Sequence, residues 1–199
     1  MSRKLDPRVQ RTKRMFEDAI LELLSEKEFQ KITVQEITKR ASLNRATFYL
    51  HYYDKNELLE QYLDSALKDL RESVKIPDNE FTYNCEQPHP TFVRLLEKMM
   101  ENSRFYKIML AEEKIPYFTE KVAVVIEELV EQGQSFLQQD RIEQRIPVPI
   151  VKAYIASAYL GVIIWWLKND MPYTPVYMST QLTIMSTVGA FVDNPYLKK

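Results

Sequence analysis

Residues 29–59 read FQKITVQEITKRASLNRATFYLHYYDKNELL and contain two short helical patterns separated by a tight turn. Thr33 and Glu36 have the spacing of a capping box, in which the two side chains satisfy backbone N–H groups at the start of a helix. Asn44 is a favourable N-cap for the second helix, which the pattern extends to His51. Two helices this short bury little surface alone, so another helix must cover them. The segment therefore predicts a helix-turn-helix.

Longer helical patterns lie on both sides of this segment. Apolar residues recur four apart between residues 9 and 26, which predicts a helix that covers the short pair. A second capping pattern at Asp54–Glu57 precedes a longer helix that reaches Leu70. After a proline-containing linker at 76–90, helical patterns resume at residues 91–102, 105–112, 117–139, 148–168 and 176–192. No convincing alternating strand pattern occurs, so the predicted fold class is all-α.

The rare residue types exclude most enzyme motifs. Gly133, Gly161 and Gly189 are each separated by 28 positions, so a glycine-rich nucleotide loop and a nucleophile elbow are absent. Cys85 and His89 lie in the linker, and two ligands make a poor metal site. Adjacent acidic pairs point in different directions on a helix and are better read as solvated faces. A helical enzyme is thus the weakest hypothesis, and we expect no cofactor and no metal.

The sequence also argues against a membrane segment. The basic N-terminus leads into an amphipathic stretch, so it does not resemble a signal peptide. The longest uncharged stretch, 153–167, has 15 residues, whereas a spanning helix needs about 20. We therefore expect a helix buried inside the protein, no membrane partner and a cytoplasmic location, with which the single cysteine agrees.

Charge is distributed unevenly along the chain. Residues 1–55 contain 12 Lys and Arg against 8 Asp and Glu, whereas residues 56–199 contain 15 against 20. The predicted domains are a basic helix-turn-helix head at 1–55 and an acidic, larger helical domain at 56–199. A basic cluster alone is more often a solvated tail, so the charge supports DNA binding only together with the helix-turn-helix.

The second short helix has one face for the core and one for a partner. Phe48 and Tyr52 are four residues apart and can face the core. Arg45 and Tyr49 then form an exposed i,i+4 pair. Arg45 could bind guanine O6 and N7, and Tyr49 could reach a phosphate.

Three further side chains extend the predicted DNA contact. Thr47 could meet a thymine methyl group or a phosphate, and His51 offers an imidazole at phosphate reach. Lys55 lies at the start of the next helix, whose unpaired N–H groups attract phosphate. An ordinary helical subdomain with a chance motif is the alternative.

Residues 9–60 resemble the DNA-binding head of TetR-family transcriptional regulators. The features that match are Thr33, the Ile37…Ala41 spacing, Thr47-Phe48-Tyr49…His51-Tyr52, and Asp54-Lys55…Glu57-Leu58-Leu59. Ser42 departs from the family, which usually has Gly in this turn, and a left-handed Ser costs about 1 kcal/mol. Ala46 stands where Gly or Pro is frequent. The resemblance implies DNA contacts at Thr33, Arg45, Thr47, Tyr49, His51 and Lys55, and Asn44, the predicted N-cap, is included with them.

The resemblance also implies a variable C-terminal domain that binds a small effector and a dimer formed by the last two long helices. Residues 153–167 are apolar nearly all round, so their helix must be covered on most sides. Small residues there (Ala156, Ser157, Ala158 and Gly161) would allow a second helix to approach closely. Residues 92–110 resemble a C-terminal type from Gram-positive bacteria. Candidate residues for binding an apolar or aromatic effector are Phe105, Tyr106, Met109, Tyr154 and Trp165, although aromatic residues at this spacing are usually core.

These observations predict a homodimeric repressor that binds a palindromic operator in double-stranded DNA and is released by an effector. The alternative is a DNA-binding adaptor or activator that is controlled by a partner protein and needs no small molecule.

Overall fold

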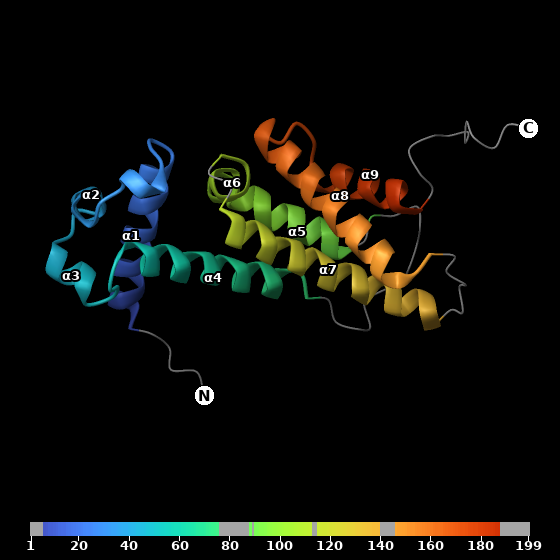
Figure 1. Cartoon of the computed structure of the whole chain (residues 1–199), viewed down its shortest axis with the longest axis horizontal. Helices are drawn as coiled ribbons and strands as arrows, with labels where there is room; N and C mark the ends of the chain where they lie inside the picture. The colour runs from blue at the N-terminus through green and yellow to red at the C-terminus, as the bar shows by residue number, and fades with distance from the viewer. Residues whose placement is uncertain (1–5, 76–87, 89, 113–114, 140–145, 188–199) are drawn as a thin grey trace, which may run out of the picture. The chain divides into compact units, whose positions relative to one another are not determined.

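The computed structural model describes residues 6–75, 88, 90–112, 115–139 and 146–187, and every regular element among them is helical (Figure 1). Cys85, His89 and the end of the last predicted helix, residues 188–192, lie outside this part of the chain. The elements are α1 (Pro7–Leu24), η1 (Phe29–Lys31), α2 (Val34–Arg40), α3 (Arg45–Tyr49), α4 (Lys55–Ser73), α5 (Pro90–Glu101), α6 (Ser103–Tyr106), η2 (Lys107–Glu112), α7 (Pro116–Gln139), α8 (Val148–Lys168) and α9 (Pro175–Thr187).

The chain forms two compact units, residues 1–68 and 69–199, which divide inside α4. The domain boundary predicted after residue 55 follows the change of charge along the sequence, and it stays a prediction. The compact units follow packing instead, because the first part of α4 contributes buried leucines, Leu58, Leu59 and Leu63, to the N-terminal unit.

An aromatic cluster forms the core of the N-terminal unit. Phe16 of α1 and Phe48 of α3 are fully buried, and their rings meet edge to face with centroids 5.3 Å apart. Tyr52 is 2% exposed, and its ring lies 6.0 Å from that of Phe16. The prediction that Phe48 and Tyr52 face the core is confirmed. Burial raises the pKa of the Tyr52 phenol, because the ionised form would lose its hydration.

The turn between α2 and α3 requires one left-handed residue, as the sequence predicted. Ser42 has φ 54°, and the N–H groups of Ser42 and Leu43 donate to the carbonyls of Lys39 and Thr38 at 3.2 and 2.9 Å. These bonds satisfy carbonyl groups at the end of α2 and reverse the chain. The departure from Gly at this position is therefore accommodated within the expected turn.

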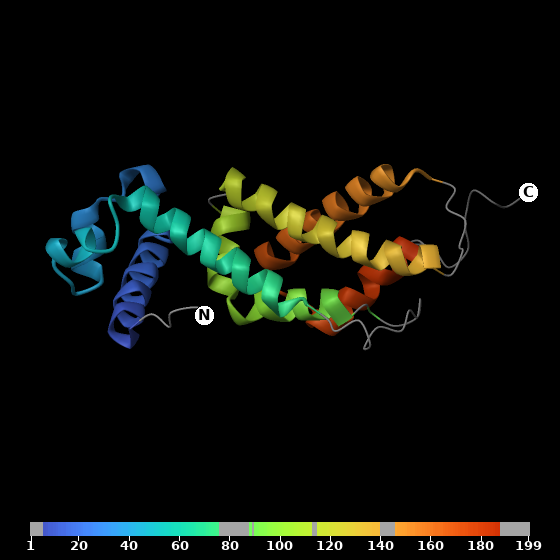
Figure 2. The same cartoon turned by 90° about the horizontal axis from the view of Figure 1, so that it is seen from below.

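The C-terminal unit packs α7 against α8 and α5 against α9 (Figures 1 and 2). Trp166 of α8 is fully buried, and its indole N–H donates to the Tyr173 carbonyl at 2.9 Å. The buried Tyr159 hydroxyl donates to the Leu182 carbonyl of α9 at 3.0 Å, and burial raises its pKa. Residues 105–112, predicted as one helix, instead form the end of α6 and the π-helical η2.

The prediction that 153–167 forms a helix buried inside the protein is met in part within this chain, which buries Ala156, Tyr159, Ile163, Trp166 and Leu167. Helix α8 has 21 residues and a mean hydropathy of 1.7 in its most apolar window, of which 28% is buried. By length and composition it could cross a membrane, which the 15-residue count did not indicate. The pattern correctly indicated an apolar surface all round, and within the described residues the face that carries Ile150, Tyr154 and Trp165 stays exposed.

Replacing Phe48 with Ala tests the aromatic core. The variant should lose about 3–5 kcal/mol of unfolding free energy, because the removed ring leaves a cavity against Phe16 and Tyr52. Urea denaturation measures the loss. Tyr53→Ala is the matched control, since Tyr53 is 85% exposed and its loss should change stability by about 0.5 kcal/mol or less. Equal losses from both variants would contradict this core.

Candidate nucleic-acid interface

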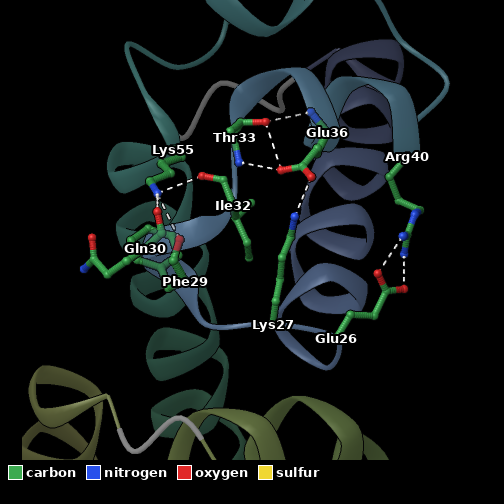
Figure 3. Close-up of polar contacts among 9 residues, drawn as sticks. All are labelled: Glu26, Lys27, Phe29, Gln30, Ile32, Thr33, Glu36, Arg40 and Lys55. Carbon is green, nitrogen blue, oxygen red and sulfur yellow. Dashed lines mark hydrogen bonds and ion pairs between the residues drawn. The ribbon is translucent and has the colours of Figure 1, made fainter.

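The start of α2 is fixed by the predicted capping box. Thr33 Oγ1 accepts from the Glu36 N–H at 3.3 Å, and Glu36 Oε2 accepts from the Thr33 N–H at 3.0 Å (Figure 3). The Thr33 hydroxyl also donates to Glu36 Oε2 at 2.9 Å. The remaining carboxylate oxygen of Glu36 pairs with the Lys27 ammonium. Together, Lys27 and then Thr33 lower the pKa of Glu36 from 4.5 to about 2.

A bidentate ion pair ties α2 to the end of α1. The Arg40 guanidinium donates to both carboxylate oxygens of Glu26 at 2.8 and 2.9 Å (Figure 3), and to Glu22 at 3.1 Å. These hydrogen bonds raise the pKa of Arg40. An exposed ion pair contributes little to the free energy of unfolding. This contact matters for orientation, because its two planar groups set the angle of α2 against α1.

The recognition-helix candidate α3 begins at the predicted N-cap. Asn44 Oδ1 accepts from the Thr47 N–H at 2.7 Å and from the Thr47 hydroxyl at 2.9 Å. The Thr47 hydroxyl proton is thus used inside the protein, which leaves the methyl group and the oxygen lone pairs for a partner. The half-buried Thr47 and the exposed Asn44 lie at the start of the helix.

Arg45 and Tyr49 form the expected exposed pair. The Arg45 guanidinium donates to the Tyr49 hydroxyl across 3.4 Å, and 51% of Tyr49 is exposed. The Tyr49 ring rests edge to face on Phe48 at 5.5 Å, so the buried core holds the exposed pair in place. His51 is half-buried beside Tyr52, just after the helix ends.

Two exposed side chains near α3 were missed by the sequence analysis. Leu50 is 81% exposed and Tyr53 is 85% exposed, and both lie in the turn between α3 and α4. A large apolar residue with little buried area suggests a contact surface. The only signal in the sequence was their place beside the capping pattern at Asp54, where helical spacing assigns them to no core face.

The Lys55 ammonium has its partners inside the N-terminal unit, and its DNA contact stays a prediction. The ammonium group donates to the carbonyl oxygens of Phe29, Gln30 and Ile32 at 2.9, 3.0 and 2.8 Å. The N–H groups of Asn56 and Glu57 at the start of α4 donate to the Asp54 carboxylate, which lowers the pKa of Asp54. The donors on which the expected phosphate contact relied are therefore satisfied within the protein.

The candidate effector residues differ in burial. Phe105, Tyr106 and Met109 are buried on α6 and η2, whereas Tyr154 and Trp165 of α8 are 68% and 46% exposed. The five therefore do not line one enclosed site in this chain. Within the described residues, no group of three His, Cys, Asp or Glu side chains is placed to hold a metal ion.

Comparison with known families decides the identity of this fold. A model of the bacterial regulatory proteins of the tetR family matches residues 18–62, and a model of a transcriptional regulator C-terminal region matches residues 86–187. The chain belongs to the TetR family of transcriptional regulators. Members of this family are DNA-binding transcriptional regulators.

Individual relatives are distant. The HTH-type transcriptional regulator YxbF of Bacillus subtilis is 22% identical over 180 residues, which are 90% of this chain and 45% of YxbF, so the chain spans less than half of that relative. A TetR regulator from Streptococcus agalactiae has TM-score 0.63 and 23% identity, over 90% of this chain and 95% of its own. FadR from B. subtilis, solved in complex with stearoyl-CoA, has TM-score 0.65 and 16% identity, over 89% of this chain and 98% of its own. The activator DhaS of a dihydroxyacetone kinase operon has TM-score 0.59 and 18% identity, over 88% of this chain and 93% of its own.

The capping box should give the N-terminal unit a defined acid sensitivity. Because the pKa of Glu36 is lowered on folding, its contribution is complete above pH 4.5 and is lost as the pH falls toward about 2. The wild-type protein should therefore melt at a higher temperature than Glu36→Gln at neutral pH, and the difference should narrow below pH 4.5. Melting followed by circular dichroism from pH 7 to 2 measures this. A difference that stays constant to pH 2 would refute the assignment.

Proposed function

We propose that this protein is a cytoplasmic homodimeric repressor that recognises a palindromic operator through α3 and leaves it when an effector binds the C-terminal unit. The observation that carries the proposal is the exposed Arg45–Tyr49 pair, which stands on a buried aromatic core. Side chains that read bases must be exposed on a helix held in one position, and α3 meets both conditions.

The contacts of each side chain suggest its role. Arg45 is proposed to bind guanine O6 and N7 in the major groove, because its guanidinium meets only the Tyr49 hydroxyl at 3.4 Å among the contacts described. Thr47 offers its methyl group to thymine, since its hydroxyl proton is bound by Asn44. Tyr49 and His51 are proposed to donate to phosphates. Thr33 and Asn44 contribute by capping α2 and α3, and their exposed edges face the same partner.

The dimer proposal rests on one face of α8. Ile150, Tyr154 and Trp165 are 59%, 68% and 46% exposed, and Ser157 and Gly161 lie between them at helical spacing. A Cβ built on Gly161 meets nothing within 4 Å, so a second helix has room to approach. An exposed apolar row with small central residues fits a second copy of the same helix, and a two-fold axis would match a palindrome. Tyr154 and Trp165 are thereby proposed for this interface and no longer for the effector site.

The effector, if small, is proposed to be apolar and to bind near Phe105, Tyr106 and Met109. Support comes from the apolar character of this region and from FadR, whose solved complex contains stearoyl-CoA. DhaS, an operon activator with the same fold, supports the second candidate, an activator or adaptor that a partner protein controls. If an apolar ligand alone releases the protein from its operator, that result favours the repressor over the activator or adaptor.

Selection from a random pool of duplexes tests the DNA-binding proposal. The wild-type protein should enrich a palindrome at physiological salt, whereas Arg45→Ala/Tyr49→Ala should not, because the base-reading pair is gone. Lys68→Ala, which removes an exposed positive charge from α4, is the control and should enrich the same palindrome. If the double variant enriched the wild-type sequence, the assignment of α3 as the reading helix would be wrong.

Sedimentation velocity tests the dimer. Gly161→Arg should shift the protein from dimer to monomer while its helical circular dichroism spectrum stays that of the wild type, because the new side chain enters open space in the protomer but places two unpaired charges in the apolar interface of the dimer. Met100→Arg, an equivalent change at an exposed position of α5, should remain dimeric. A dimeric Gly161→Arg protein would exclude this face of α8.

A further inference from the structure

The strongest unexplained contact in the N-terminal unit is the cage around the Lys55 ammonium. Its three N–H groups point at three backbone carbonyl oxygens, those of Phe29, Gln30 and Ile32, all within 3.0 Å (Figure 3). An ammonium group has three donors, so this set is complete. The same nitrogen lies 4.7 Å from the centroid of the Phe29 ring, which adds a cation–π attraction.

The three carbonyls belong to one turn of chain that leads into α2. Phe29 and Gln30 lie in η1, and Ile32 directly precedes the N-cap Thr33. The Phe29 carbonyl also accepts from the Ile32 N–H at 3.1 Å, and an ammonium that binds all three carbonyls holds the turn in one shape. Lys55 is the first residue of α4. The cage therefore joins the beginning of α4 to the entry of α2.

A second ion pair fixes the other side of the same turn. Lys27, which precedes η1, pairs with Glu36 in the first turn of α2. The turn is thus fixed from α4 by Lys55 and from α2 by Glu36, as Figure 3 shows. Because α2 packs on α3, the position of this turn determines how α3 is presented to DNA.

We propose that Lys55 is a positioning residue for operator recognition, which acts through η1, Thr33 and α2 and does not contact a phosphate itself. This inference rests on the proposed reading of DNA by α3. Moving the ammonium to a phosphate would leave three carbonyl oxygens without it, so the exchange gains no hydrogen bonds. Arg45, by contrast, has an exposed guanidinium to offer.

Two substitutions separate positioning from phosphate binding. Lys55→Met removes the ammonium and keeps the stem, whereas Lys55→Arg keeps the positive charge but replaces three convergent donors with a planar fork. Lys31→Met is the matched control, because it removes one charge from η1, where Lys31 is 67% exposed and pairs with Glu28. Affinities for the selected operator and for a scrambled duplex are measured over a range of KCl concentrations, below the melting temperature of every variant.

Positioning predicts that both Lys55 variants lose about tenfold in operator affinity, comparable to one charge-assisted hydrogen bond. Their affinity for the scrambled duplex and its salt dependence should match the wild type, and Lys31→Met should keep the wild-type ratio of the two affinities. A phosphate contact predicts the opposite: Lys55→Met lowers the slope of log K against log[salt] by about 0.9 on both duplexes, and Lys55→Arg restores binding. That result, or an unchanged affinity ratio in both Lys55 variants, would overturn the proposal.

Hydrogen exchange in the free protein gives a readout that does not depend on the operator. Lys55→Met should speed amide exchange across residues 28–36 and leave α1 at the wild-type rate, because only the caged turn loses its partner. Unchanged exchange at 28–36 would overturn the positioning role even if DNA binding by α3 were confirmed. Failure of the wild-type protein to enrich any duplex would instead count against the proposed function alone.

Discussion

The edge-to-face contact between Phe16 and Phe48 is the constraint on which the N-terminal unit depends. Helices of seven and five residues, α2 and α3, are too short to persist in water without tertiary contacts. Burying Phe48 against α1 gives α3 its place and leaves the adjacent Tyr49 pointing outward. A residue that reads DNA thus sits next to the residue that anchors its helix, so exposure and rigidity arise from the same contact.

Polar contacts fix the orientations within the N-terminal unit that apolar burial does not set. Burial holds α3 against α1 but does not set its rotation or the path of the turn that leads to α2. Three polar contacts each fix part of this geometry: the capping box at Thr33, the bidentate Arg40–Glu26 pair and the carbonyl cage around Lys55. These groups are partly exposed, so their value is in geometry more than in free energy. A base-reading helix needs such geometry, because a small displacement would move Arg45 away from a base edge.

The sequence predicted what depends on local spacing. Both N-caps, the left-handed Ser42 and the inward positions of Phe48 and Tyr52 follow from residue type and helical period, and the structure confirms them. The destination of the Lys55 ammonium could not be read in this way, because its partners are backbone atoms more than twenty residues away. The same holds for α8: its sequence shows an apolar surface all round, but not which face stays exposed within the chain. The effector candidates differ in burial because composition does not tell which face an aromatic residue occupies.

Base reading by Arg45 of α3 can be measured with a base-pair scan of the selected operator. Each base pair of one half-site is replaced in turn, and the affinities of the wild type and Arg45→Ala are compared. Arg45→Ala should lose about 1–3 kcal/mol of discrimination at a single base pair and keep the wild-type preference at the others. A uniform loss of affinity over all duplexes, with every preference retained, would show that Arg45 contacts only the backbone and would contradict the account.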